Sequence, residues 1–320
     1  MAEFGYTLLG EQRGPRRLVE DAIRAEEAGF DFAVTSDHYY PWVEEQGHSP
    51  YAWAVLGAVA YATQQMRLMS FVTCPTRRYH PVVVAQKAAT IALMSENRFT
   101  LGLGAGENIN EHVVGGWPHA TERHRMFAEA LQIIQPLLVG QTVHHDGEYF
   151  DVPEARLWDR PPEGVPIGVA VSGPDSCELA AAYGDAMIAA EPRADLVQEF
   201  EARGGVRRPR YGQVALCYGQ DEGRCRRMAH QQFAWFGLGW PVMSELPGPD
   251  SMARASSAVT EDQVAESIPC GPDLDQHVAA VRRYLDSGFT HVALIQVGGE
   301  SQGAFLDFAE KELLPALRSS

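Results

Sequence analysis

The length, composition and charge of the chain exclude several classes of protein. Its 320 residues, 45% of them hydrophobic and 21% charged, suit a globular protein with one large α/β barrel or two average domains. The formal net charge of −16 argues against a nucleic-acid partner, because such partners need a basic surface. No apolar run approaches ~18 residues and the first residues lack a signal-peptide pattern, so we expect no membrane partner and a cytoplasmic location. The five cysteines show no CxxC pair and no regular spacing, which predicts neither disulfides nor a metal site.

Short apolar segments rich in β-branched residues recur along the chain and alternate with amphipathic stretches. We expect strands at residues 4–9, 30–36, 67–73, 99–105, 165–172, 185–190, 212–218 and 291–297. Their apolar residues are consecutive, which is typical of parallel strands buried on both faces. Helical periodicity fills several of the gaps, for example at residues 16–30, 82–98 and 125–140. A doubly wound sheet stays open, but the strand count and the length favour a single (β/α)₈ barrel domain over residues 1–320.

Two insertions interrupt this alternation. Residues 141–164 are predicted to form a small hairpin and a loop before the fifth strand. Residues 219–275 separate the last two strands and contain a dense apolar set, namely Trp235, Phe236, Trp240 and Met243. Because a solvated loop would not carry so many apolar side chains, we expect either a helical cap over the barrel mouth or an oligomer contact.

The segment TSDHYYPW, residues 35–42, follows the second predicted strand directly. In a (β/α)₈ barrel the catalytic groups lie at the carboxyl ends of strands and in the loops that follow. Asp37, His38 and Trp42 occupy such a position and are therefore candidate site residues. A histidine beside an aspartate that caps a helix would give the same pattern, and the segment alone leaves both interpretations open.

The segment GLGAGENINEH, residues 102–112, follows the fourth predicted strand. It is weak evidence for a dinucleotide fold, because Glu107 stands where the G-x-G-x-x-G fingerprint needs its last glycine. We expect a glycine-rich strand end that lets a flat ring approach the backbone, with Glu107 directed at the barrel mouth. Asn110, Glu111 and His112 are interpreted as a solvated helix start in preference to metal ligands.

Two further strand ends carry polar groups. VTCPTRRYHP, residues 72–81, offers Arg77 and Arg78 either to an anionic ligand or to a surface turn. VAVSGPDS, residues 169–176, ends a strand with small residues and begins a helix. Free backbone N–H groups at a helix start can bind phosphate, so this segment is a candidate phosphate site.

Taken together, these four segments resemble, in order and spacing, the luciferase-like hydride transferases. The resemblance is to the branch that uses the 8-hydroxy-5-deazaflavin coenzyme F420, typified by a glucose-6-phosphate dehydrogenase. It implies a (β/α)₈ barrel of the bacterial luciferase type. It also implies that His38 takes the alcohol proton as a base tuned near neutral pH, that Trp42 forms a wall of the substrate site, and that Glu107 is the acid for the coenzyme ring. Asp37 would contact the deazaflavin or hold the imidazole.

The resemblance implies further features of the coenzyme site and of the assembly. A non-proline cis peptide bond is expected between Phe71 and Val72, behind the ring. A homodimer is expected as well. The residues that would line the coenzyme are Asp37, Val72, Cys74, Ala105, Asn110, Ser172, Gly173 and Pro174.

The sequence departs from the sugar-phosphate pattern where the phosphate would be bound. The positions aligned with that pocket are Glu191, Arg193, Ala194, Glu266 and Thr290. Two carboxylates there would repel a phosphate dianion, and only Arg193 remains as a replacement. We therefore expect an oxidoreductase for an uncharged alcohol, sugar or hemiacetal instead of glucose 6-phosphate. An FMN-dependent monooxygenase of the same superfamily and a non-catalytic deazaflavin-binding protein are the alternatives.

Overall fold

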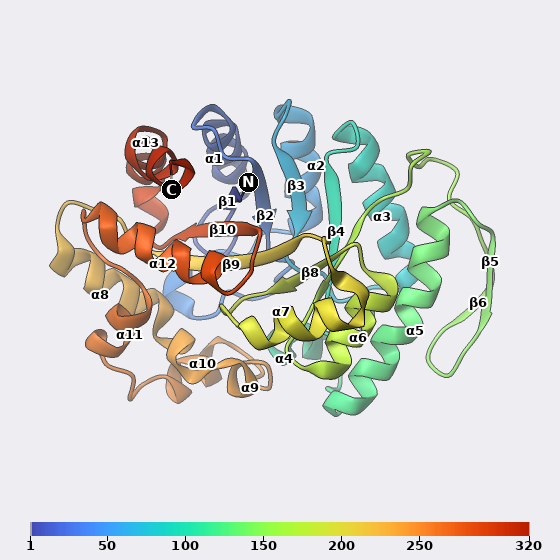
Figure 1. Cartoon of the computed structure of the whole chain (residues 1–320). Coiled ribbons are helices and arrows are strands. Elements are labelled where there is room, and N and C mark those ends of the chain that lie inside the picture. Colours follow the sequence, from blue (N-terminus) through green and yellow to red (C-terminus); the bar gives the residue numbers. More distant parts are fainter. Residues whose placement is uncertain (1, 320) are drawn as a thin grey trace.

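A computed structural model describes residues 2–319, and these form a closed barrel of eight parallel strands surrounded by helices (Figure 1). The predicted (β/α)₈ barrel is confirmed, and each expected segment overlaps one barrel strand. The strands follow one another around the barrel in the order β1-β2-β3-β4-β7-β8-β9-β10, and β10 pairs with β1. Their bounds are β1 Glu3–Thr7, β2 Phe32–Thr35, β3 Arg67–Ser70, β4 Phe99–Leu103, β7 Ile167–Ala170, β8 Ala186–Ala189, β9 Arg210–Leu216 and β10 His291–Gln296.

Helices on the outside of the barrel complete the fold. Helix α1 begins with Pro15, whose fixed φ suits the first helical position, and the chain turns out of it at Gly29 with φ 89°. The outer helices are α1 Pro15–Glu27, α2 Ala52–Ala62, α3 Pro81–Met94, α5 Ala120–Leu138, α6 Pro174–Tyr183, α7 Ala194–Phe200, α12 Leu274–Asp286, α13 Gln302–Phe308 and α14 Leu314–Arg318.

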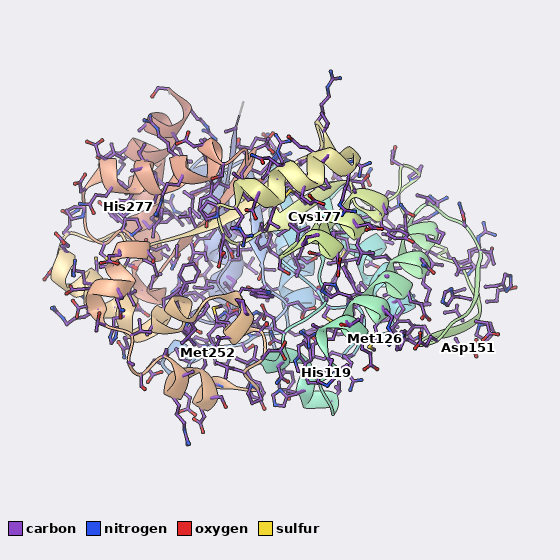
Figure 2. All side chains as sticks on the ribbon, turned by 60° about the horizontal axis from the view of Figure 1, so that its bottom comes forward. His119, Met126, Asp151, Cys177, Met252 and His277 are labelled. Carbon is purple, nitrogen blue, oxygen red and sulfur yellow. The ribbon has the colours of Figure 1, made fainter. Side chains whose placement is uncertain are left out.

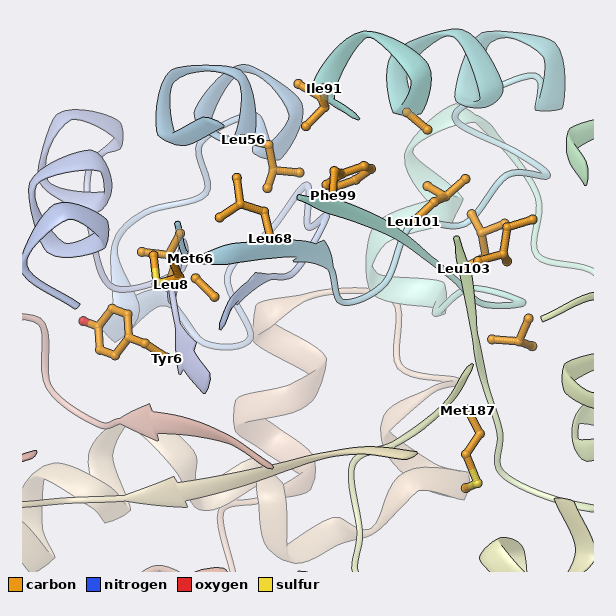
Figure 3. Close-up of a cluster of buried hydrophobic side chains, with 14 of the residues drawn as sticks. Tyr6, Leu8, Leu56, Met66, Leu68, Ile91, Phe99, Leu101, Leu103 and Met187 are labelled. Atoms are coloured by element: carbon orange, nitrogen blue, oxygen red, sulfur yellow. The ribbon is translucent and has the colours of Figure 1, made fainter. Parts of the chain in front are cut away.

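Two apolar layers hold the barrel together. The larger lies between strands and helices, where Leu68 and Phe99 of the barrel pack toward Leu56 of α2 and Ile91 of α3 (Figure 3). Burial of such side chains stabilises the fold by about 25 cal/mol per Å² of apolar surface. The smaller layer fills the barrel interior, and its buried members are Phe32, Val34, Met69, Ala186, Ile188, Tyr211 and Ala293.

The first insertion forms the predicted hairpin. Strands β5 (Val143–Asp146) and β6 (Asp151–Ala155) pair antiparallel and lie outside α5, and Asp151 is at the outer edge of the molecule (Figures 1 and 2). The Glu129 side chain on α5 accepts hydrogen bonds from the backbone N–H groups of Tyr149 and Phe150. This contact attaches the hairpin to the barrel, on the side away from the second insertion.

The second insertion forms a helical cap, which we define as residues 219–275. Its helices are α8 Glu222–Phe233, α9 Trp240–Met243, α10 Pro249–Ala255 and α11 Glu261–Ser267, and they lie together at one end of the barrel (Figure 1). The cap shares an apolar cluster with the barrel, in which Phe233, Trp235 and Met252 pack with Leu9 and Ile295. Figure 2 labels Met252 within this cap. The predicted cap over the mouth is therefore present.

The ends of the cap meet at a narrow neck. The Cys217 N–H donates to the Pro269 oxygen at 2.9 Å, and the Gly271 N–H donates to the Cys217 oxygen at 3.0 Å. All five cysteines are buried free thiols. Within residues 2–319, no helix has the length and hydropathy needed to cross a membrane.

Candidate active site

A cavity of about 640 Å³ lies between the barrel mouth and the cap. Every barrel strand contributes to its lining through the strand itself or the loop that follows. These contributions include Leu9 after β1, His38 after β2, Val72 after β3, Gly104 after β4, Val171 after β7, Ala190 after β8, Gln213 on β9 and Ile295 on β10. The cavity therefore occupies the position where barrels of this kind place their chemistry.

His38 lies between two carboxylates in this cavity. Its Nδ1 is 2.9 Å from Glu11 Oε1, and its Nε2 is 3.4 Å from Glu107 Oε2. The Glu11 contact lies at ion-pair distance without the alignment of a hydrogen bond, and residues 2–319 offer neither Glu11 oxygen a hydrogen-bond donor. Glu11 is buried, and the cationic group in contact with its carboxylate is the His38 imidazole. The arrangement favours an imidazolium ion between two carboxylates.

The charge state of His38 follows from this environment. Burial alone would lower its pKa, but the Glu11 and Glu107 carboxylates outweigh burial and raise the pKa of His38 to about 10. The expected pKa near neutral is therefore wrong for the coenzyme-free protein. At pH 7 the imidazole carries a proton and acts as a donor toward the cavity.

Asp37 lines the cavity but does not hold the imidazole. Its Oδ2 accepts from Trp53 Nε1 at 3.0 Å and from Thr73 Oγ1 at 2.9 Å. Its Oδ1 accepts from the Tyr79 hydroxyl at 3.2 Å. Glu11 is the carboxylate that contacts the imidazole. The prediction that Asp37 holds the imidazole is therefore wrong. Asp37 ties the loop after β2 to the loop after β3.

The arginine-rich turn after β3 and the polar residues after β4 form one buried network. Arg78 Nε donates to Glu111 Oε1 at 2.9 Å, and Arg78 Nη1 lies 3.4 Å from Asp37 Oδ1. Asn110 and Glu111 are buried, so the predicted solvated helix start is wrong. Arg78 is committed to these carboxylates, and Arg77 donates to the Gly115 oxygen. Arg78 is therefore not free to bind an anionic ligand, and Arg77 lies outside the lining of the cavity.

A smooth wall of small residues forms the side of the cavity next to β3 and β4. The peptide bond between Phe71 and Val72 is cis, as the resemblance implied. A Cβ atom at Gly104 would approach Val72 Cγ2 to 2.7 Å, so only glycine keeps this surface open. Ala105 and Cys74 extend it, and burial raises the pKa of the Cys74 thiol to about 12, which keeps it uncharged.

The helix start after β7 differs from the predicted phosphate site. The N–H groups of Ser172 and Gly173 both donate to Ser176 Oγ, at 2.9 and 3.1 Å, so they are not free. Pro174, the next residue, has no N–H. Ser172 and Ser176 line the cavity, whereas Gly173 and Pro174 lie just outside its lining.

An aromatic wall faces the small-residue wall. Trp42 stacks on Trp235 of the cap, with ring centroids 4.3 Å apart and an interplanar angle of 15°. His38 meets the edge of Trp42 at a centroid distance of 4.8 Å. Phe236 and Met243 of the cap also line this side. The imidazole therefore has an apolar surface beside it, against which a substrate can be positioned.

The residues aligned with a phosphate pocket are not brought together. Glu191 and Arg193 line the cavity, and Arg193 Nε donates to Asp195 at 2.7 Å. Ala194 begins α7 just outside the lining, and Glu266 is exposed on α11. Thr290 precedes β10, at the opposite end of the barrel from the cavity, where it binds the Arg210 N–H. The predicted pocket is therefore wrong at Ala194, Glu266 and Thr290.

Sequence reasoning missed Arg123 and Trp235, which line the cavity, and Glu11, which contacts His38. Glu11 had a usable signal, because it is an acidic residue shortly after the first strand and β1 pairs with β2. Trp235 was noticed only as an apolar residue of the insertion. Arg123, on the first turn of α5, is buried and carried no signal in the sequence.

Comparison with known proteins decides the family. The family model described as luciferase-like monooxygenase matches residues 2–291. The chain belongs to the luciferase-like monooxygenase family.

Two relatives and two solved structures show which members this luciferase-like chain is similar to. It is 34% identical to an F420-dependent glucose-6-phosphate dehydrogenase of Beutenbergia cavernae, over 100% of this chain and 98% of the relative. It is 33% identical to a protein of the same name from Amycolatopsis mediterranei, over 100% and 99%. An F420-dependent secondary alcohol dehydrogenase in complex with an F420-acetone adduct superposes with a TM-score of 0.89, 29% identity and 99% coverage of both chains. An F420-dependent tetrahydromethanopterin reductase from Methanopyrus kandleri, with TM-score 0.79, 20% identity and 99% coverage of both, shares the fold.

Proposed function

We propose that the protein is a coenzyme F420-dependent oxidoreductase that interconverts an uncharged alcohol and its carbonyl compound. The observation that carries the proposal is the His38 imidazole, set between Glu11 and Glu107 beside the aromatic wall. Proteins similar to this chain are named as F420-dependent dehydrogenases of a sugar phosphate and of a secondary alcohol. The bound deazaflavin supplies hydride transfer without oxygen activation.

The cavity residues fit a flat, partly anionic coenzyme. Gly104 leaves a surface that any larger residue would fill, and Val72, Ala105 and the neutral Cys74 thiol continue it. Other polar groups of the lining are Ser172, His124 and Arg123, of which Arg123 is also bonded to Glu245 and to the Pro118 oxygen. We assign the ring to the small-residue wall, with Asp37 and Asn110 at its rim, and the anionic part to these polar groups.

The acid–base chemistry belongs to His38 and Glu107. In the reducing direction the His38 imidazolium donates its proton to the carbonyl oxygen, and Glu11 stabilises the charged ring. In the oxidising direction His38 must first lose that proton before it can accept one from the alcohol. Glu107 contacts His38 and accepts from Asn110 Nδ2 at 3.0 Å. In the oxidising direction it would donate the proton that the ring takes up besides the hydride, and in the reducing direction it would accept that proton back. Trp42 positions the substrate.

An uncharged substrate fits the charges of this site best. Glu107 and Glu191 line the cavity, Glu11 is buried against His38, and Arg193 is paired with Asp195. The aromatic wall of Trp42 and Trp235 favours an apolar carbon skeleton. We therefore propose neutral alcohols, sugars or hemiacetals, and not glucose 6-phosphate, as substrates.

Coenzyme titration tests the proposal against the alternatives. We expect the pure protein to bind the deazaflavin tightly and FMN weakly, and to reduce the deazaflavin with a neutral alcohol. The family description also covers monooxygenases, so tight FMN binding without deazaflavin binding would support that second function instead. Deazaflavin binding without turnover on a broad alcohol panel would indicate a binding protein.

We also propose a homodimer in the cytoplasm. Large apolar side chains are exposed on three neighbouring outer helices, at Ile23 of α1, Tyr61 of α2 and Leu93 of α3. Burial of such a surface against a second copy is favourable. The five free thiols fit a reducing compartment. Light scattering at micromolar concentration tests the assembly, and a monomer mass would contradict it.

A further inference from the structure

Two consecutive residues of the cap reach across the mouth and bind the segment after β4. The Ser244 oxygen accepts from the Asn108 N–H at 2.9 Å. The Glu245 oxygen accepts from Asn108 Nδ2 at 2.8 Å. Asn108 is therefore held by its backbone and by its side chain to one short piece of the cap.

The Glu245 carboxylate makes a second attachment in the same place. Its Oε2 accepts from Trp117 Nε1 at 2.7 Å, and its Oε1 accepts from Arg123 Nη2, also at 2.7 Å. Arg123 is buried and lies over the Trp117 ring at 4.0 Å. Both partners belong to the chain between β4 and the first turn of α5. The guanidinium of this pair is buried and the Glu245 carboxylate is about half exposed, so solvent screens the pair on one side only.

The bonds between the cap and Asn108 affect the position of Glu107, the preceding residue. Asn108 is the first residue of the four-residue helix α4 (Asn108–Glu111), and Glu107 precedes it in extended conformation. A helix of one turn is not stable by itself, because the conformational entropy lost in nucleating a helix exceeds the stabilisation from the hydrogen bonds of a single turn. The position of Glu107, and its 3.4 Å contact with His38, therefore depends on the contacts that hold α4, which are the Arg78–Glu111 pair at one end and the bonds of Asn108 to the cap at the other.

We propose that Glu245 is a positioning residue that latches the cap onto the loop after β4 and thereby holds Glu107 against His38. The role in turnover rests on the proposed oxidoreductase function. The same latch fixes α9, whose Trp240 and Met243 face the cavity, so it also sets the substrate wall. When the latch opens, Glu107 moves away from His38 and the wall recedes.

The test compares Glu245→Ala and Glu245→Gln with the wild type in three measurements. The control is Asp250→Asn, an exposed carboxylate on the same cap. Hydrogen exchange of the Asn108 amide reports the latch itself, since that N–H is bonded to Ser244. NMR titration of His38 in the coenzyme-free protein reports the distance to Glu107. The kcat/KM for alcohol oxidation reports catalysis.

For Glu245→Ala we expect exchange of the Asn108 amide to rise by about tenfold or more, because the latch opens locally. We expect the pKa of His38 to fall measurably, and kcat/KM to fall by about ten- to hundredfold, the loss typical of a displaced catalytic group. Glu245→Gln should lie between Ala and wild type, because its amide oxygen still accepts one hydrogen bond. Asp250→Asn should match the wild type in all three.

Two results would overturn the inference. Unchanged Asn108 exchange in Glu245→Ala would show that the carboxylate does not hold the cap. Faster exchange with an unchanged His38 titration would show that the latch does not position Glu107. If the wild type turns over no alcohol, the proposed function fails, while exchange and titration still decide the latch.

Discussion

Glu11→Gln tests the arrangement around His38 most directly. In the wild type, Glu11 Oε1 is 2.9 Å from His38 Nδ1, and their side chains are 1% and 10% exposed. The substitution keeps the size of the side chain and removes its charge. His38 then keeps only Glu107 as a neighbouring carboxylate, while burial continues to lower its pKa.

The size of the effect follows from Coulomb's law. At an effective dielectric constant near 20, opposite charges about 4 Å apart attract by about 4 kcal/mol, and one pH unit corresponds to about 1.4 kcal/mol. The substitution should therefore bring the pKa of His38 from about 10 to about 7. Deprotonated His38 is the base for alcohol oxidation, so its working form would already be populated at neutral pH.

The assay is the pH dependence of kcat/KM for alcohol oxidation, with NMR titration of His38 alongside. In the wild type the rate should rise with pH toward the pKa of about 10. In Glu11→Gln the rise should occur about three pH units lower, with a smaller limiting rate because a weaker base accepts the proton. Glu44→Gln, an exposed carboxylate nearby, serves as the control. Superimposable profiles for Glu11→Gln and wild type would refute the reasoning.

The same contact links stability to pH. The folded-state pKa of His38 is raised from its model-compound value of 6.5 to about 10. Its contribution to stability is therefore complete below about pH 6.5 and is lost as the pH rises through about 10. Urea unfolding should show the wild type losing stability between pH 7 and pH 10, and Glu11→Gln losing less over that interval.

Three further predictions concern the site. His38→Ala and Glu107→Gln should each lower turnover by ~10²–10⁴-fold, the range for a lost acid or base, with coenzyme affinity within about tenfold; near-full turnover in either variant would contradict their roles. Asp37→Ala leaves several buried donors unpaired and should lower the free energy of unfolding by about 3–5 kcal/mol, measured in urea. Arg193→Ala should leave kcat/KM for neutral alcohols within about threefold, since Arg193 is paired with Asp195; a strong preference for glucose 6-phosphate that this variant abolishes would contradict the substrate proposal.

The barrel was predictable because its signals are local. Strands buried on both faces carry consecutive apolar residues, and this pattern marked all eight barrel strands. The strand-end rule then placed His38 and Glu107 at one mouth without any knowledge of their distance. The structure ends the strands up to three residues earlier than predicted, for example at Ser70 before the cis bond.

Features that depend on contacts between distant segments were not predictable in the same way. Trp235 meets Trp42 only because the cap folds back over the mouth. The Ser172 and Gly173 N–H groups were misjudged because Ser176 accepts from both, a local capping arrangement that the spacing of the segment would have allowed us to expect. Thr290 and Glu266 were misplaced because their alignment had to cross an insertion whose path the sequence does not define.

The structure supports the preference for an uncharged substrate through a different set of residues from the one that suggested it in the sequence. Glu266 and Thr290 lie away from the cavity, but Glu11 and Glu107 flank the reactive imidazole and Glu191 lies on the cavity wall. One imidazolium among three carboxylates leaves an excess of negative charge, Arg78 is held in a buried pair with Glu111, and Arg193 faces Asp195 in an exposed pair. A phosphate group about 4 Å from one such carboxylate is repelled by about 4 kcal/mol per pair of unit charges at an effective dielectric constant near 20. A neutral hydroxyl meets no such repulsion and can bind His38 directly. The charges that raise the pKa of His38 are therefore also the charges that select against a sugar phosphate.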